Sequence, residues 1–91
     1  MFRVELELVK KDLQKLPRHI VEKLNTWVFD VQLHGLYEVR KIPSYHDEPL
    51  KGNRKGQRSI RLNKAYRAIY TTTSEGSVTL VTVEEVNKHD Y

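Results

Sequence analysis

Apolar and polar residues alternate at the start of the chain and again through its C-terminal half. The first alternation places apolar side chains at Phe2, Val4, Leu6 and Leu8, and this period of two is typical of a strand with one buried face. Residues 57–63, 66–72 and 78–84 are predicted to form three further strands, joined by a tight connection at 63–65 and a Gly-containing turn at 73–77. In the first of these strands, Ser59 and Arg61 are expected on one face, and Ile60 and Leu62 on the face toward the helices. Consecutive strands with such short connections predict an antiparallel meander.

Between the first strand and the meander the spacing of apolar residues becomes helical. Residues 10–34 are predicted to form a helical hairpin with one apolar face. Pro17 fits the first position of the second helix, where a missing N–H costs little, and Gly35 is suited to its C-cap. The apolar positions of the two helices are Val9, Leu13 and Leu16, and then Ile20, Leu24, Trp27, Val28 and Val31. This apolar face must pack on the strands.

The remaining segment is less regular. Residues 36–42 are compatible with another helical turn, and residues 43–56 are predicted to be a loop because they hold Pro43, Pro49, Gly52, Asn53 and Gly56. The predicted order is β-α-α-β-β-β. It describes a two-layer α+β fold, in which the helical hairpin packs on a small, largely antiparallel sheet. A length of 91 residues predicts one domain spanning 1–91.

Composition excludes several classes of protein. With 38% apolar and 31% charged residues the chain is globular and not disordered. It contains no apolar run near the ~20 residues that span a bilayer, so we expect a soluble protein with no membrane partner. Residues 1–5 lack a hydrophobic signal region, so we expect no secretion by that route. The absence of cysteine rules out disulfides, thiol catalysis and thiolate zinc sites, and it fits a cytoplasmic location.

Charge divides the chain sharply. Between Lys51 and Ser74 there are seven basic residues and no acid, whereas the other nine Lys and Arg face all twelve Asp and Glu, so the rest carries about −3. A concentrated basic segment is typical of a protein that binds a phosphate backbone. A solvated face that aids solubility is the alternative. The basic residues are Lys51, Arg54, Lys55, Arg58, Arg61, Lys64 and Arg67.

Several familiar catalytic motifs are absent from the sequence. Residues 52–57 contain glycines and a lysine but lack the Gly-Lys-Ser/Thr ending of a phosphate-binding loop. The histidines show no paired spacing for zinc, and no Gly-x-Ser-x-Gly elbow occurs. These absences exclude a phosphate-binding loop, a paired-histidine zinc site and a hydrolase elbow, and we expect no metal and no cofactor.

Cleavage of RNA by its own 2′-hydroxyl requires a base, an acid for the leaving 5′-oxygen, and cations for the charge of the phosphorane. Glu48 or His46 could serve as the base, and His89 as the acid because imidazole titrates near neutrality. Arg61 and Arg67 could hold the transition state, since guanidinium matches phosphate bidentately. These five residues flank or lie within the basic segment.

The end of the chain offers an aromatic candidate. Tyr91 could stack on a base of the RNA. The alternative is that the closing His-Asp-Tyr is an ordinary tail. By contrast, we expect Trp27, Tyr66 and Tyr70 to pack in the core rather than to stack on a substrate.

Four blocks of this sequence resemble the RelE/HigB branch of the RelE/ParE superfamily of bacterial toxins. They are PLKG at 49–52, GQRSIRLN at 56–63, YRAIY at 66–70 and VNKHDY at 86–91. The resemblance implies a RelE-like, microbial-RNase-like fold. It also implies an mRNA interferase that inhibits translation by cutting mRNA in the ribosomal A site, without metal, through 2′-hydroxyl attack. Implied partners are the ribosome, mRNA and a cognate antitoxin, and the toxin–antitoxin complex would bind operator DNA through the antitoxin. The implied location is the bacterial cytoplasm.

The resemblance also assigns roles to residues. Glu48 precedes PLKG, where some members keep an acidic general base, and Arg67 matches the strand arginine that contacts the scissile phosphate. His89 matches the terminal histidine that some members use as acid, and Tyr91 would be the nearby aromatic. RNA backbones would be held by the basic residues Lys51, Arg54, Lys55, Arg58 and Arg61, with Lys64 and His46 as further RNA-binding candidates.

Alternatives remain open within this hypothesis. The base could be His46 in place of Glu48, or Lys51 if its cationic neighbours favoured the neutral amine. The order His-Asp-Tyr departs from the adjacent His-Tyr or Tyr-His of close relatives. Two other functions are compatible with the same pattern: a ParE-like toxin that inhibits gyrase, and a non-catalytic basic module that binds RNA or DNA.

Overall fold

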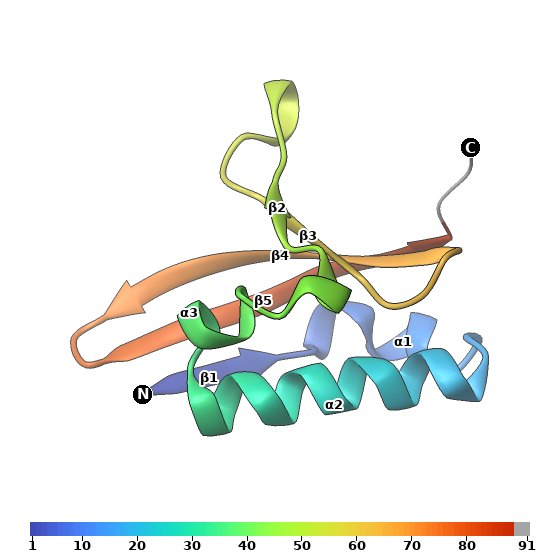
Figure 1. Ribbon diagram of the computed structural model, residues 1–91, viewed down its shortest axis with the longest axis horizontal. Coiled ribbons are helices and arrows are strands. Elements are labelled where there is room, and N and C mark those ends of the chain that lie inside the picture. Colours follow the sequence, from blue (N-terminus) through green and yellow to red (C-terminus); the bar gives the residue numbers. More distant parts are fainter. Residues whose placement is uncertain (89–91) are drawn as a thin grey trace.

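The computed structural model describes residues 1–88 and shows helices packed on one face of a five-stranded sheet (Figure 1). The strands are β1 (Phe2–Glu5), β2 (Glu48–Pro49), β3 (Arg58–Arg61), β4 (Tyr66–Glu75) and β5 (Val78–Lys88), in the spatial order β1-β5-β4-β3-β2. β1 runs parallel to β5, and the other neighbours are antiparallel. The predicted α+β fold is confirmed.

The helices are α1 (Lys10–Leu13), α2 (Arg18–His34) and α3 (Leu36–Val39). Pro17 precedes α2 instead of opening it, because its ψ of 142° is extended. Gly35 ends α2 as expected: its φ is 89°, and its N–H donates to the Val31 carbonyl at 2.9 Å. Within residues 1–88 no helix has both the length and the apolar character needed to cross a membrane.

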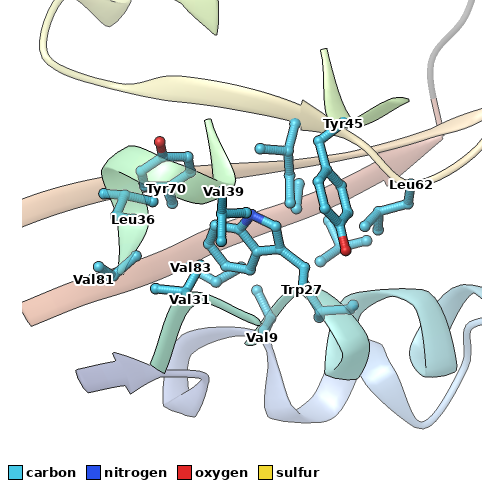
Figure 2. Close-up of a cluster of buried hydrophobic side chains, with 14 of the residues drawn as sticks. Val9, Trp27, Val31, Leu36, Val39, Tyr45, Leu62, Tyr70, Val81 and Val83 are labelled. Atoms are coloured by element: carbon cyan, nitrogen blue, oxygen red, sulfur yellow. The ribbon is translucent and has the colours of Figure 1, made fainter. Parts of the chain in front are cut away.

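The core lies between α2 and the sheet (Figure 2). The α2 stripe predicted from the sequence is buried at Ile20, Leu24, Trp27 and Val31. Figure 2 shows Trp27 beside Val39 and Tyr70, and the Trp27 and Tyr70 ring centroids are 5.3 Å apart. Trp27 and Tyr70 are fully buried, as expected, and Tyr66 packs partly buried against the same cluster.

Several boundaries differ from the sequence prediction. The first strand ends at Glu5, and a 3-10 turn at Glu7–Val9 buries Val9 while leaving Leu8 63% exposed. The expected loop at 43–56 contains 3-10 turns at Pro43–Tyr45 and Gly52–Arg54, with the two residues of β2 between them. The last hairpin is longer than expected, since β-branched residues at 71–73 continue β4 to Glu75 and leave only 76–77 as the turn.

β5 carries a bulge where it crosses the centre of the sheet. Ile69 pairs with Glu85 but the next residue, Tyr70, pairs with Val83, so Glu84 has no partner on β4. The extra residue shifts the alternation of β5 by one position. As a result Val83 and Val86 both face the core, although they are three positions apart on the strand.

Candidate active site on the open face of the sheet

The face of the sheet away from α2 carries the candidate catalytic residues. Across the strands, Glu48 pairs with Ser59, Ser59 with Ile69, and Ile69 with Glu85. Two residues further along, Arg61 pairs with Arg67. Residues two apart on a strand share a face, whereas the intervening Ile60 and its partner Ala68 are buried in the core. The open face therefore gathers Glu48, Arg61 and Arg67, as the alternation of residues 57–63 predicted for Arg61.

Side chains from β2, β3 and β4 meet in one cluster on this face. Arg67 Nη1 donates to Ser59 Oγ at 3.0 Å and to Glu48 Oε1 at 3.4 Å. His46 Nε2 lies 3.5 Å from the other Glu48 oxygen, Oε2. The Arg67 side chain is 18% exposed and that of Glu48 is 45% exposed. We call His46, Glu48, Ser59 and Arg67 the Glu48 cluster; it joins a solvent-accessible carboxylate to a guanidinium fixed by a hydroxyl.

Arg61 extends the Glu48 cluster with a second guanidinium. Its Cα lies directly opposite that of Arg67 across β3 and β4, and its side chain is exposed. Within residues 1–88 Arg61 forms no ion pair. Two arginines side by side on one face create a positive potential, which the ion pair of Arg67 with Glu48 partly offsets, and such a pair of guanidinium groups suits a phosphate.

The backbone turns sharply where the Glu48 cluster begins. His46 has φ 46° and ψ 50°, and among the described residues it is the one non-glycine with a positive φ. A left-handed conformation costs an L-residue roughly 1–2 kcal/mol, and strain of this kind concentrates at functional sites. The left-handed residue His46 follows the 3-10 turn at Pro43–Tyr45, and the side chains of His46 and Glu48 are about half exposed.

Asp47, between these two residues, points inward. Its side chain is 1% exposed and accepts from Arg58 Nε and Tyr70 Oη, each at 2.6 Å. Arg40 Nε donates to the same Tyr70 oxygen at 3.2 Å. Burial, followed by the bond to Asp47, raises the pKa of Tyr70 far above its ordinary value of 10. We call Arg40, Asp47, Arg58 and Tyr70 the Asp47 network.

The Asp47 network is not predictable from the sequence pattern. Asp47 stands between two flagged candidates, but nothing in the pattern shows that it faces the core. Arg58 was predicted to bind RNA, and its side chain is only 26% exposed because it pairs with Asp47. Burial opposes the charge of Arg58, but the hydrogen bond and ion pair with Asp47 outweigh that effect and raise its pKa.

The segment Leu50–Gln57 projects from the open face (Figure 1) and is held against β5. Arg54 donates to both oxygens of Glu85, at 2.9 and 3.2 Å, and also to the Gln57 side chain. Gln57 donates to Glu84, the bulge residue, at 2.9 Å. Hydrogen bonds from Arg54 and then Asn87 lower the pKa of Glu85. Acidic residues of β5 thus neutralise part of the positive charge of the basic segment Lys51–Ser74.

The other predicted RNA-binding residues remain solvent-accessible. Lys51, Lys55 and Lys64 are exposed and form no ion pair within residues 1–88. Together with Arg61 they are the available cations of the basic segment. The part of the chain that the structure describes contains no pocket, and none of its His, Asp and Glu side chains group to hold a metal ion. The described part of the site is therefore an open surface.

The remaining candidates, His89 and Tyr91, lie outside the described residues. The last described residue, Lys88, pairs with Tyr66, and Asn87 pairs with Arg67. β5 therefore ends beside the strand that carries Arg67. The structure tests neither the acid role of His89 nor the stacking role of Tyr91.

Comparison with solved structures identifies the class of fold. No protein-family model matches the chain, and no curated protein matches it. Solved toxin structures, however, match over nearly the whole chain, and the chain has the RelE-like fold of the RelE/ParE-superfamily toxins.

Three of these structures illustrate the match. YafQ from E. coli strain BL21(DE3) has a TM-score of 0.69 and 19% identity, covering 98% of this chain and 94% of YafQ. The YoeB–YefM complex from Staphylococcus aureus has a TM-score of 0.68 and 20% identity, covering 99% of each chain. The toxin–antitoxin complex RelBE2 from Mycobacterium tuberculosis has a TM-score of 0.64 and 22% identity, covering 98% of this chain and 96% of the matched chain.

Proposed function

We propose that this chain is the toxin of a bacterial type II toxin–antitoxin system and that it cleaves mRNA on the ribosome. The observation that carries the proposal is the Glu48 cluster: a carboxylate and a fixed arginine meet on the open face, with Arg61 opposite, in a chain with the RelE-like fold. The reaction class is metal-independent transfer of the phosphodiester to the ribose 2′-oxygen.

Glu48 is the proposed general base. It takes the proton of the ribose 2′-hydroxyl while the 2′-oxygen forms a bond to phosphorus. The bond from phosphorus to the 5′-oxygen breaks, and His89 gives that oxygen a proton, so the products are a 2′,3′-cyclic phosphate and a free 5′-hydroxyl. Contact with Arg67 favours Glu48 over Lys51, which lies on the projecting segment. His46 touches Glu48 and remains the alternative base.

Arg67 and Arg61 are the proposed electrostatic groups. Negative charge grows on the non-bridging phosphate oxygens as the phosphorane forms, and donors that are already fixed in place stabilise it most. The hydrogen bond from Arg67 to Ser59 supplies that fixation. Tyr91 is proposed to stack on a neighbouring base of the RNA.

The open form of the site supports a macromolecular substrate. A surface without a pocket encloses little of a small molecule, whereas small-molecule sites are concave. Lys51, Lys55 and Lys64 are exposed and suit RNA phosphates. We propose that the ribosome supplies the opposing surface that holds the mRNA, and that a cognate antitoxin, which also binds operator DNA, neutralises the toxin in the cytoplasm.

Induction of the chain in bacteria tests the proposal. We expect growth arrest, and primer extension should show new 5′ ends within translated codons. Arg67→Ala and His89→Gln should each relieve the arrest while circular dichroism shows a folded protein. Arg18→Ala is the matched control, because Arg18 lies exposed on α2 and, among residues 1–88, forms an ion pair with Glu22 alone; it should remain toxic. Full toxicity of both site variants would refute the assigned roles.

The same experiment separates the two other functions. The ParE-like alternative predicts arrest with altered DNA supercoiling and intact mRNA, and a gyrase assay measures it directly. The non-catalytic alternative predicts binding to naked RNA or DNA without new 5′ ends. Either result would replace the endoribonuclease.

A further inference from the structure

Three consecutive residues at the start of β2 point in opposite directions. The side chains of His46 and Glu48 are 54% and 45% exposed, whereas that of Asp47 is 1% exposed. We propose that Asp47, held by Arg58 and Tyr70, is a positioning residue that fixes Glu48 against Arg67. The proposal rests on the function proposed above for Glu48 and Arg67, and it adds residues that do not touch the RNA.

The backbone around Glu48 needs such an anchor because it has few bonds of its own. β2 is two residues long, and one of them, Pro49, has no N–H to donate. It pairs only with Ser59 and Arg58 on β3, and the chain enters it through the left-handed turn at His46. A short edge strand after a strained turn does not hold a side chain in one place unless its surroundings do.

The Asp47 network supplies the missing restraint. One carboxylate oxygen of Asp47 accepts from Arg58 on β3, and the other accepts from Tyr70 on β4. The Tyr70 oxygen in turn accepts from Arg40, which follows α3. The Tyr70 ring is fully buried against Trp27. The position of Glu48 is thus tied through one peptide unit to the centre of the core.

A network that merely stabilises the fold would have the same contacts, so the test needs a second buried tyrosine whose aspartate partner lies away from the open face. Tyr45 provides it. Tyr45 is also buried, and its hydroxyl also donates to an aspartate, Asp30, at 3.2 Å. Asp30 lies on α2, on the other side of the core from the open face. Tyr70→Phe and Tyr45→Phe therefore each remove a hydroxyl that donates to an aspartate, but only the first of these aspartates adjoins Glu48.

The experiment measures single-turnover cleavage of ribosome-bound mRNA, and amide hydrogen exchange of the free protein, for the wild type and both variants. We expect Tyr70→Phe to lower the cleavage rate by about 10- to 100-fold with an unchanged KM, since small misplacements of a catalytic group have effects of that size. Exchange should rise at Glu48 and Leu50 and not at Ile60. Tyr45→Phe should match the wild type in rate. Asp47→Asn, which keeps the shape of the side chain, should repeat the Tyr70→Phe result if that variant folds poorly.

Each result decides the proposal. Equal rates for Tyr70→Phe and the wild type, or equal losses in Tyr70→Phe and Tyr45→Phe, would overturn it, because then the bond to Asp47 contributes only stability. If the wild type does not cleave RNA, the proposed function fails; unchanged exchange at Glu48 in Tyr70→Phe would then reject the anchoring itself, and raised exchange would retain it.

Discussion

The chain from His46 to Gln57 is anchored to the sheet at two points that differ in depth. The first is the pair of Asp47 and Arg58, whose side chains are 1% and 26% exposed. The second is the pair of Arg54 and Glu85, whose side chains are 47% and 34% exposed. The deep anchor adjoins Glu48, and the shallow anchor adjoins the free cations Lys51 and Lys55. This division gives rigidity to the groups proposed for chemistry and freedom to those proposed to grip RNA.

The physical difference between the anchors is solvent. Removing one partner of a buried ion pair leaves the other charge without water or counter-charge, which is strongly destabilising. An exposed pair loses little when it breaks, because water replaces each partner. The two anchors should therefore respond differently to mutation, pH and salt.

The largest expected effect concerns activity. Glu48→Gln keeps the size of the side chain but removes the base, so we expect the cleavage rate to fall by about 10²- to 10⁴-fold with nearly unchanged RNA affinity. Lys55→Gln is the matched change on the shallow-anchored segment. It should weaken RNA binding and reduce its salt dependence while the rate at saturation persists. Single-turnover kinetics at two salt concentrations separate the two effects.

A variant Glu48→Gln that cleaves normally would remove Glu48 as base. If His46→Gln lost activity while Glu48→Gln kept it, the base would be His46, whose Nε2 lies 3.5 Å from Glu48 Oε2. A lower rate at saturating RNA in Lys55→Gln would show that Lys55 contributes to the chemical step and not to RNA binding alone.

The second effect is on stability. Asp47→Ala leaves Arg58 without its buried partner, so we expect the free energy of unfolding to fall by about 3–5 kcal/mol in urea titrations. Asp12→Ala is the control, because Asp12 is exposed and forms no ion pair among residues 1–88. Comparable losses in the two variants would contradict the assignment of Asp47 as the deep anchor.

Local patterns were enough to predict the strands, the α2 stripe and the open-face position of Arg61. Each depends on a short periodicity that tertiary structure preserves. The end of the first strand at Glu5 was not predictable in this way, because Leu6 and Leu8 continue the alternation and only the 3-10 turn at Glu7–Val9 shows where it breaks.

The candidate site was predictable only in part, for a different reason. Glu48 and Arg67 were assigned by resemblance, and the structure brings them together. The inward turn of Asp47 depends on one residue, His46, adopting a left-handed conformation that sequence periodicity does not encode. The pairing of Arg54 with Glu85 joins residues 31 apart, so the acid-free stretch is not an acid-free surface.

The third prediction uses alkaline pH to test the deep anchor. An unfolded chain loses the Tyr70 proton near pH 10, whereas burial and then Asp47 hold the pKa of the folded protein well above that value. Stability should therefore be complete below pH 10 and decline as pH rises, by at most about 1.4 kcal/mol per pH unit from this group. Urea titrations between pH 9 and 11 measure this decline as the change in the free energy of unfolding from its value at pH 8. The decline should be shallower in Tyr70→Phe than in the wild type.

Tyr45 contributes to the same decline, since burial and then Asp30 raise its pKa to about 12. The double variant Tyr45→Phe/Tyr70→Phe should be nearly independent of pH over this range. An undiminished decline in the double variant would place the alkaline transition elsewhere.

The smallest expected effect is a change in the free energy of unfolding at the shallow anchor, and it is measured by lowering the pH. The pKa of Glu85 is lowered from its ordinary 4.5 by the hydrogen bonds from Arg54 and Asn87. A carboxyl with a lowered folded-state pKa adds stability above pH 4.5, and that stability is lost as pH falls through the lower value. Glu85→Gln should therefore be slightly less stable than the wild type at pH 7, and the difference should shrink as pH falls below 4.5 and also in 1 M salt. We expect about a fifth or less of the loss in Asp47→Ala. A loss of equal size that persists in high salt would mean that both anchors are rigid, and that Lys51 and Lys55 are held as firmly as Glu48.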